Sequence, residues 1–125
     1  MIRLLRPASR ILLLDDDPSI QRLVATLLKR AGHRVDVVSS GSQALEKLNA
    51  HQYDALVLDI MTPTEGGMTV IRELREVAPE LLKRIILLTA SPESILRPIE
   101  SDVYAIVRKP FQPNELLETI SKLIA

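Results

Sequence analysis

Five short apolar runs, separated by segments with helical spacing, constrain the fold of this 125-residue chain more than any other feature. Short runs rich in Leu, Ile and Val are typical of strands that are buried on both faces of a parallel sheet. Alternation of such strands with helices indicates a sheet covered on both sides, and five units are too few for an eight-stranded barrel. We therefore predict an α/β fold with an open, doubly wound, five-stranded parallel sheet. The expected strands lie at residues 11–14, 35–38, 55–58, 85–88 and 103–107.

The segments between these runs carry apolar residues on one helical face. The first of them spans residues 20–31, with Asp17 as its expected N-cap and Gly32 at its C-terminal end. Residues 92–100 are expected to form only a short, poor helix, because Pro98 interrupts the segment. The remaining helices are predicted around residues 44–48, 70–77 and 116–124.

The composition excludes several classes of protein. Sixteen basic and sixteen acidic side chains give a net charge of zero, so the chain lacks the basic footprint of a nucleic-acid-binding domain. It contains no cysteine, which excludes disulfides, thiolate zinc sites and cysteine nucleophiles. No apolar stretch approaches the roughly 18 residues that a membrane span requires. We therefore expect neither direct nucleic-acid binding nor a membrane segment.

No Gly/Ser-rich linker divides the chain, so we predict a single domain. Residues 1–9, which include Pro7, are expected to be a leader, and residues 10–125 are expected to form the domain. The basic N-terminus lacks the apolar block of a signal peptide, so we expect a cytoplasmic location.

Polar residues follow four of the predicted strands at the point where each strand ends. They are Asp15 and Asp16, Asp59, Thr89 and Lys109. The carboxyl ends of the strands of an open parallel sheet share one edge, which is where ligands bind. Three carboxylates gathered there repel one another unless a cation is present, and Mg²⁺ favours a few carboxylate oxygens together with retained waters. The pattern therefore predicts a magnesium site at this edge.

Four motifs occur in order along the chain: ILLLDDDPS, YDALVLDIMTP, IILLTA and VRKPF. Together they resemble the receiver domain of two-component response regulators, in the CheY-like superfamily, over residues 10–125. The resemblance implies a flavodoxin-like sheet with strand order 2-1-3-4-5 and helices on both faces.

The resemblance also implies a role for individual residues around the expected metal. Asp59 matches the aspartate that accepts a phosphoryl group and becomes 4-aspartylphosphate. Asp15 and Asp16 match the acidic pair that binds Mg²⁺ together with Asp59 and the backbone carbonyl of Met61.

Further positions match the residues that stabilise the phosphoryl group and transmit the signal. Thr89 matches the switch hydroxyl, Ala90 leaves room for the phosphoryl group, and Lys109 matches the family's lysine. The resemblance implies a cis peptide bond between Lys109 and Pro110. Ile106 departs from the family, which commonly has an aromatic residue at this position, so the switch is altered there.

By resemblance, the chain is a phosphoacceptor switch and not a conventional enzyme, with only self-catalysed phosphotransfer and slow autodephosphorylation. Its expected partner is a sensor histidine kinase or a histidine phosphotransfer protein, and the change of conformation controls an output. The surface formed by residues 92–100, 103–107 and 116–124 is the expected face for a homodimer.

Three other interpretations remain. A degenerate receiver would act only as a protein–protein interaction module. The altered position of Ile106 keeps this interpretation open, but the complete set of Asp15, Asp16, Asp59, Thr89 and Lys109 argues against it. A haloacid-dehalogenase-like phosphatase shares an acidic motif after the first strand, but Lys109 and Pro110 stand where it needs a further acidic pair. A flavodoxin-like nucleotide or flavin binder would need a glycine-rich turn after the first strand, where three aspartates stand instead.

Overall fold

A five-stranded parallel sheet forms the centre of the molecule, in a computed structural model that describes residues 8–60 and 66–125. The strand order is β2-β1-β3-β4-β5, which confirms the order predicted above. Most of the expected leader, residues 1–7, lies outside the described residues. The strands are β1 (Arg10–Leu14), β2 (Arg34–Val38), β3 (Ala55–Leu58), β4 (Ile85–Thr89) and β5 (Ala105–Arg108).

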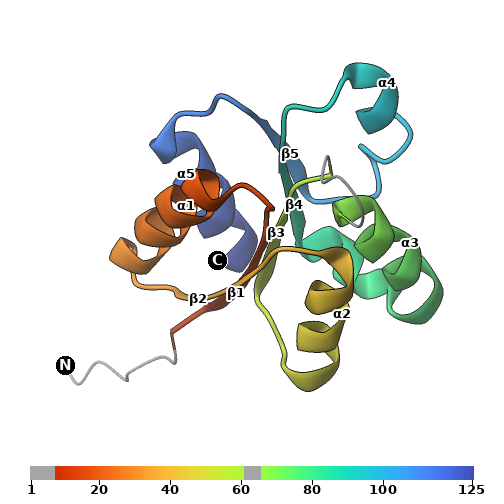
Figure 1. Ribbon diagram of the computed structural model, residues 1–125, viewed down its shortest axis with the longest axis horizontal. Helices are drawn as coiled ribbons and strands as arrows, with labels where there is room; N and C mark the ends of the chain where they lie inside the picture. Colours follow the sequence, from red (N-terminus) through yellow and green to blue (C-terminus); the bar gives the residue numbers. More distant parts are fainter. Residues whose placement is uncertain (1–7, 61–65) are drawn as a thin grey trace.

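Helices cover both faces of the sheet, as predicted. Helices α1 and α5 lie together on one side, and α2, α3 and α4 lie on the other (Figure 1). The helices are α1 (Pro18–Arg30), α2 (Gly41–Ala50), α3 (Gly67–Val77), the 3₁₀ helix η1 (Pro79–Arg84), α4 (Glu93–Leu96) and α5 (Pro113–Ile124).

Alternate residues of each central strand pack into two separate aliphatic cores, one on each face of the sheet. Leu12 and Leu14 of β1 pack with α2 and α3, whereas Ile11 and Leu13 pack with α1 and α5. This division follows from the strand geometry, because successive side chains point to opposite faces. The apolar runs are continuous for the same reason: both faces of β1, β3 and β4 are buried.

Two elements differ in detail from the sequence-based expectations. β5 begins at Ala105 and not at residue 103, because Val103 packs into the core before the strand pairing starts. η1 was not predicted, since its Pro79 start and short length give no helical periodicity. α4 spans only Glu93–Leu96, in agreement with the short helix expected there.

In the described part of the chain, no helix combines the length and the apolar character needed to cross a membrane.

Candidate metal and phosphoryl site

The carboxyl ends of β1 and β3 bring three aspartates together. Backbone hydrogen bonds continue just past both strands, with the Asp15 amide donating to Val38 and the Asp59 amide donating to Leu14 (N–O distances of 3.2 and 3.0 Å). These bonds fix the backbone from which the side chains project. Carboxylate oxygens of Asp15, Asp16 and Asp59 lie within 4.8 Å of one another. The structure thus gathers the acidic residues that the sequence placed at separate strand ends.

Lys109, which follows β5, lies against two of these carboxylates. Its Nζ is 2.6 Å from Asp15 Oδ2 and 3.1 Å from Asp59 Oδ2. The Lys109 amide donates to the Thr89 carbonyl, which extends the pairing of β4 and β5 by one bond (3.0 Å). The peptide bond between Lys109 and Pro110 is cis. One ammonium group therefore bridges the ends of β1 and β3.

Burial and the hydrogen bond between Asp15 and Lys109 shift the pKa of each group in opposite directions. Burial raises the pKa of Asp15 above its ordinary value, against the hydrogen bonds from Lys109 and from the Asp17 amide, and the charge of Asp59 adds to the rise. For Lys109, burial favours the neutral amine, but the hydrogen bonds to Asp15 and Asp59 outweigh it and raise the pKa. The lysine therefore stays charged beside the cluster of carboxyl groups.

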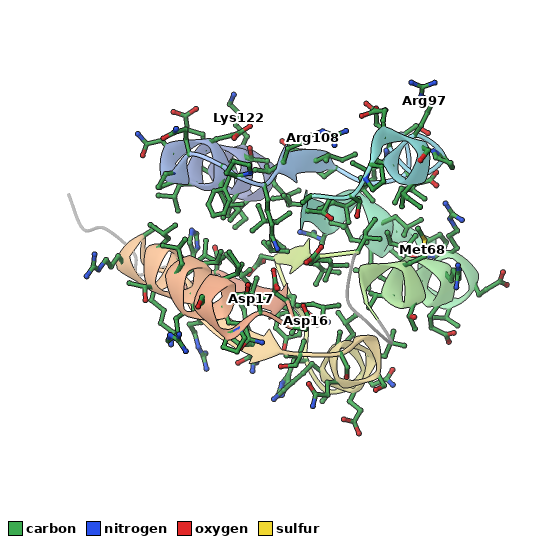
Figure 2. All side chains as sticks on the ribbon, turned by 45° about the horizontal axis from the view of Figure 1, so that its top comes forward. Asp16, Asp17, Met68, Arg97, Arg108 and Lys122 are labelled. Carbon is green, nitrogen blue, oxygen red and sulfur yellow. The ribbon has the colours of Figure 1, made fainter. Side chains whose placement is uncertain are left out.

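This donor set fits Mg²⁺. Asp15 and Asp59 are only 1% and 6% exposed, while Asp16 is more open to solvent, so the cluster combines fixed oxygens with access for retained waters. In Figure 2, Asp16 and Asp17 are seen where β1 leads into α1. Met61, whose carbonyl was expected to complete the site, lies outside the described residues.

Asp17 caps helix α1, whereas its two acidic neighbours belong to the carboxylate cluster. Its carboxylate accepts hydrogen bonds from the Ser19 and Ile20 amides (2.8 and 3.4 Å), which makes it the N-cap of α1 as predicted. Its own amide donates to Asp15 Oδ1 (2.9 Å), so the cap also orients the buried carboxylate.

Thr89 lies at the end of β4, and its side chain is fully buried. Its hydroxyl is hydrogen-bonded to the hydroxyl of Ser91 (2.8 Å) and also accepts from the Ser91 amide (3.2 Å). Ala90, between them, is exposed. Ser91 was not predicted from the sequence, although the alternation of side chains along an extended segment places residues 89 and 91 on one side.

The altered switch position is occupied by an aliphatic side chain that packs inward. Ile106 contacts the core that β1 and β3 share with α2 and α3. Tyr104, two residues before Ile106 in the sequence, precedes β5 and is 39% exposed. The nearest aromatic residue therefore does not replace the one that the family commonly has.

The matching family model is the response regulator receiver domain, and it covers residues 11–121. The transcriptional regulatory protein GltR of Pseudomonas aeruginosa is 38% identical over 116 residues, which are 91% of this chain and 48% of GltR. The chain thus spans about half the length of the first curated relatives it matches. The chemotaxis protein CheY of Bacillus subtilis is 29% identical, over 94% of this chain and 98% of CheY.

Solved structures show the same similarity. The response regulator TrrA from Thermotoga maritima, in complex with Mg²⁺-BeF, is 35% identical with a TM-score of 0.81, over 92% of this chain and 98% of that chain. The receiver domain of sensor histidine kinase PA1611 from Pseudomonas aeruginosa, with a magnesium ion in its active-site cleft, is 29% identical with a TM-score of 0.83, over 94% and 98%. The chain belongs to the receiver domain family of two-component response regulators.

Proposed function

We propose that the domain is a phosphoacceptor switch in which Asp59 takes a phosphoryl group from a histidine residue of a partner protein. The observation that carries the proposal is the contact between Lys109 Nζ and Asp59 Oδ2, at 3.1 Å, inside a cluster of three carboxylates. A lysine that served only the fold would not need a second and a third acid beside its partner.

The chemistry follows from the groups present. A carboxylate oxygen of Asp59 attacks phosphorus, the bond from phosphorus to the donor nitrogen breaks, and an acyl phosphate forms. Phosphoryl transfer depends mainly on positioning and on neutralising the charge of the equatorial oxygens. Lys109 supplies one positive charge within reach of Asp59. A Mg²⁺ ion held by Asp15, Asp16 and Asp59, with the Met61 carbonyl as a further ligand, would supply the remaining charge neutralisation.

The proposed donor is a sensor histidine kinase or a histidine phosphotransfer protein in the cytoplasm. The product carries about two negative charges beside the end of β4, which gives Thr89 a new acceptor for its hydroxyl. Movement of Thr89 would change the surface of α4, β5 and α5, and we propose that this surface transmits the output, through a homodimer or another partner.

Acetyl phosphate tests the proposal without knowledge of the donor. Incubation with acetyl phosphate and Mg²⁺ is expected to add the mass of one phosphoryl group to the intact protein. The addition should require Mg²⁺ and should be absent from Asp59→Asn. Labelling that persists in Asp59→Asn would overturn the assignment, and an unlabelled parent protein would favour the degenerate receiver.

A further inference from the structure

We propose that Ser91 is a positioning residue for Thr89, and that it sets how readily the domain switches. Ser91 holds the Thr89 hydroxyl in the resting state and must release it when Asp59 carries a phosphoryl group. This inference rests on the proposed function of Asp59.

The contact between the two hydroxyls is buried and short. Thr89 and Ser91 are 0% and 1% exposed, and their oxygens are 2.8 Å apart. The Thr89 oxygen also accepts from the Ser91 amide (3.2 Å), so the hydroxyl has partners both in the side chain and in the backbone of the same residue. A buried hydroxyl that loses its partner keeps the cost of its desolvation, which makes this contact difficult to break.

The loop that carries Ser91 is itself attached to β5. Arg108 donates from Nη1 to the Ser91 carbonyl (3.1 Å), and its Nη2 forms an ion pair with Glu93 at the start of α4. Arg108 lies on β5 between α5 and α4 (Figure 2). Ser91 therefore cannot simply follow Thr89, because its carbonyl is held from the neighbouring strand.

Ser91 and a phosphoryl group on Asp59 would therefore compete for the Thr89 hydroxyl. When Thr89 turns to donate to a phosphoryl oxygen, Ser91 loses its hydroxyl partner in a buried place. Replacing Ser91 by alanine removes this cost from the switched state and removes the favourable contact from the resting state. Both effects favour switching, and a hydrogen bond of ordinary net strength corresponds to about a fivefold change in an equilibrium.

This role does not depend on an aromatic residue at the altered switch position. Ile106 is packed into the core, and a β-branched side chain is restricted at χ1. A change of hydrogen-bond partner at the Thr89 hydroxyl therefore requires no movement of Ile106.

Beryllofluoride with Mg²⁺, which mimics a phosphoryl group on an aspartate, provides the test. Backbone amide signals of ¹⁵N-labelled protein report the titration in the parent and in every variant, including those that lack the Thr89 hydroxyl. The apparent affinity for beryllofluoride is expected to rise about fivefold in Ser91→Ala, since a larger fraction of the protein is then competent to bind. Ser94→Ala removes a hydroxyl from an exposed position on α4 and should leave the affinity unchanged.

A double-mutant cycle separates positioning from general structure. In a Thr89→Val background, Ser91→Ala should change the apparent affinity by less than about twofold, because no hydroxyl remains to be held. Ser91→Thr, which keeps a hydroxyl, should retain the parent affinity. Arg108→Gln is a second variant, at an exposed position. It removes the guanidinium that holds the Ser91 carbonyl, so it should also raise the apparent affinity for beryllofluoride.

The outcomes distinguish this inference from the proposed function. If the parent protein does not bind beryllofluoride, or Asp59→Asn still binds it, the proposed function fails. If the parent binds, Asp59→Asn does not, and both Ser91→Ala and Arg108→Gln match the parent, the role of Ser91 is wrong. An equal change in the presence and absence of the Thr89 hydroxyl would likewise overturn it.

Discussion

The three carboxylates of the acidic cluster repel one another, and two of them are attracted to the Lys109 ammonium. Asp15 and Asp59 are buried, and both contact the Lys109 ammonium. Asp16 adds a third carboxylate within 4.8 Å and has no ion pair among those the structure gives for the described residues. Without a metal, Asp16 is therefore the member whose charge the fold compensates least.

Asp16→Asn is expected to stabilise the metal-free protein while weakening its binding of Mg²⁺. Relief of like-charge repulsion should raise the free energy of unfolding by about 0.5 kcal/mol, and loss of a ligand should lower the Mg²⁺ affinity at least about tenfold. Urea denaturation and isothermal titration measure the two effects.

Asp17→Asn is the matched control for this variant. It removes a charge one residue further along, and asparagine caps a helix as well as aspartate does. Its Mg²⁺ affinity should equal that of the parent. Parent-like Mg²⁺ binding by Asp16→Asn would show that the metal does not use this carboxylate.

The sequence was sufficient to predict which charged residues meet, but not which hydroxyls do. Asp15, Asp59 and Lys109 each follow a buried strand, and the topology of a parallel sheet brings strand ends to one edge. Alternation along the extended chain after β4 places Ser91 on the same side as Thr89, but the hydrogen bond between the two hydroxyls depends on their side-chain torsions. Side-chain torsions leave no periodic signal in a sequence.

At the scale of elements, the site depends on close contact between the end of β3 and the start of α3. The Gly67 amide donates to the Asp59 carbonyl (2.8 Å). A Cβ atom at Gly67 would lie 2.9 Å from that carbonyl oxygen and 3.2 Å from Leu58 Cβ. The helix can approach the backbone of Asp59 only because the residue at this position has no side chain.

Gly67→Ala is therefore expected to disturb both the fold and the metal site. Backbone contacts cannot yield as a flexible side chain can, so the free energy of unfolding should fall by about 1–3 kcal/mol. The shift of Asp59 should also lower the Mg²⁺ affinity. Urea denaturation and Mg²⁺ titration on the same sample measure both.

Gly32→Ala provides the comparison, because it changes a glycine far from β3 along the chain. Gly32 has a φ of +95°, and a Cβ atom added there would meet nothing within 4 Å, so only conformational strain, about 1 kcal/mol, is expected. Its Mg²⁺ affinity should not change. A Gly67→Ala protein with unaltered Mg²⁺ binding would contradict the proposed link between α3 and the site.

Element boundaries were predicted less well than element types. The helices α1 and α5 carry long apolar faces, so their periodicity identifies them without ambiguity. The start of β5 depends on where pairing with β4 begins, which the apolar run from Val103 to Val107 does not reveal. η1 is a single 3₁₀ segment, too short to show any period.

Across the whole molecule, a second polar cluster lies at the opposite end of the sheet from the acidic site. The Asp36 carboxylate accepts from the Tyr53 hydroxyl (2.6 Å) and from Arg10 Nε (3.0 Å), and it joins β2 to the start of β1 and to the segment before β3. Burial alone would raise the pKa of Asp36, but the hydrogen bonds from Tyr53 and Arg10 lower it below its ordinary value.

The lowered pKa determines how this cluster contributes to stability as the pH changes. The folded state favours the carboxylate, so the contribution is fully present above the ordinary pKa of 3.8. It is lost as the pH falls through the lower pKa of the folded protein. Asp36→Asn should therefore reduce the free energy of unfolding at pH 7 by about 1–2 kcal/mol, and by less at pH 3.

Urea denaturation of the parent and of Asp36→Asn at both pH values checks this prediction. Asp102→Asn, which removes an acid from a more exposed ion pair with Arg75, should have a smaller effect at pH 7. Mg²⁺ binding at the other end of the sheet should be unaffected by either change. An equal loss of stability at pH 7 and pH 3 would show that the charge of Asp36 is not what stabilises the cluster.

Asp59, and no other carboxylate of the cluster, is the residue that we propose carries the phosphoryl group. Reduction with borodeuteride converts an aspartyl phosphate into deuterium-labelled homoserine, and peptide mass spectrometry then identifies the position. After incubation with acetyl phosphate and Mg²⁺, the label is expected at residue 59. Label at Asp15 or Asp16, or label at residue 59 without prior phosphorylation, would contradict the claim.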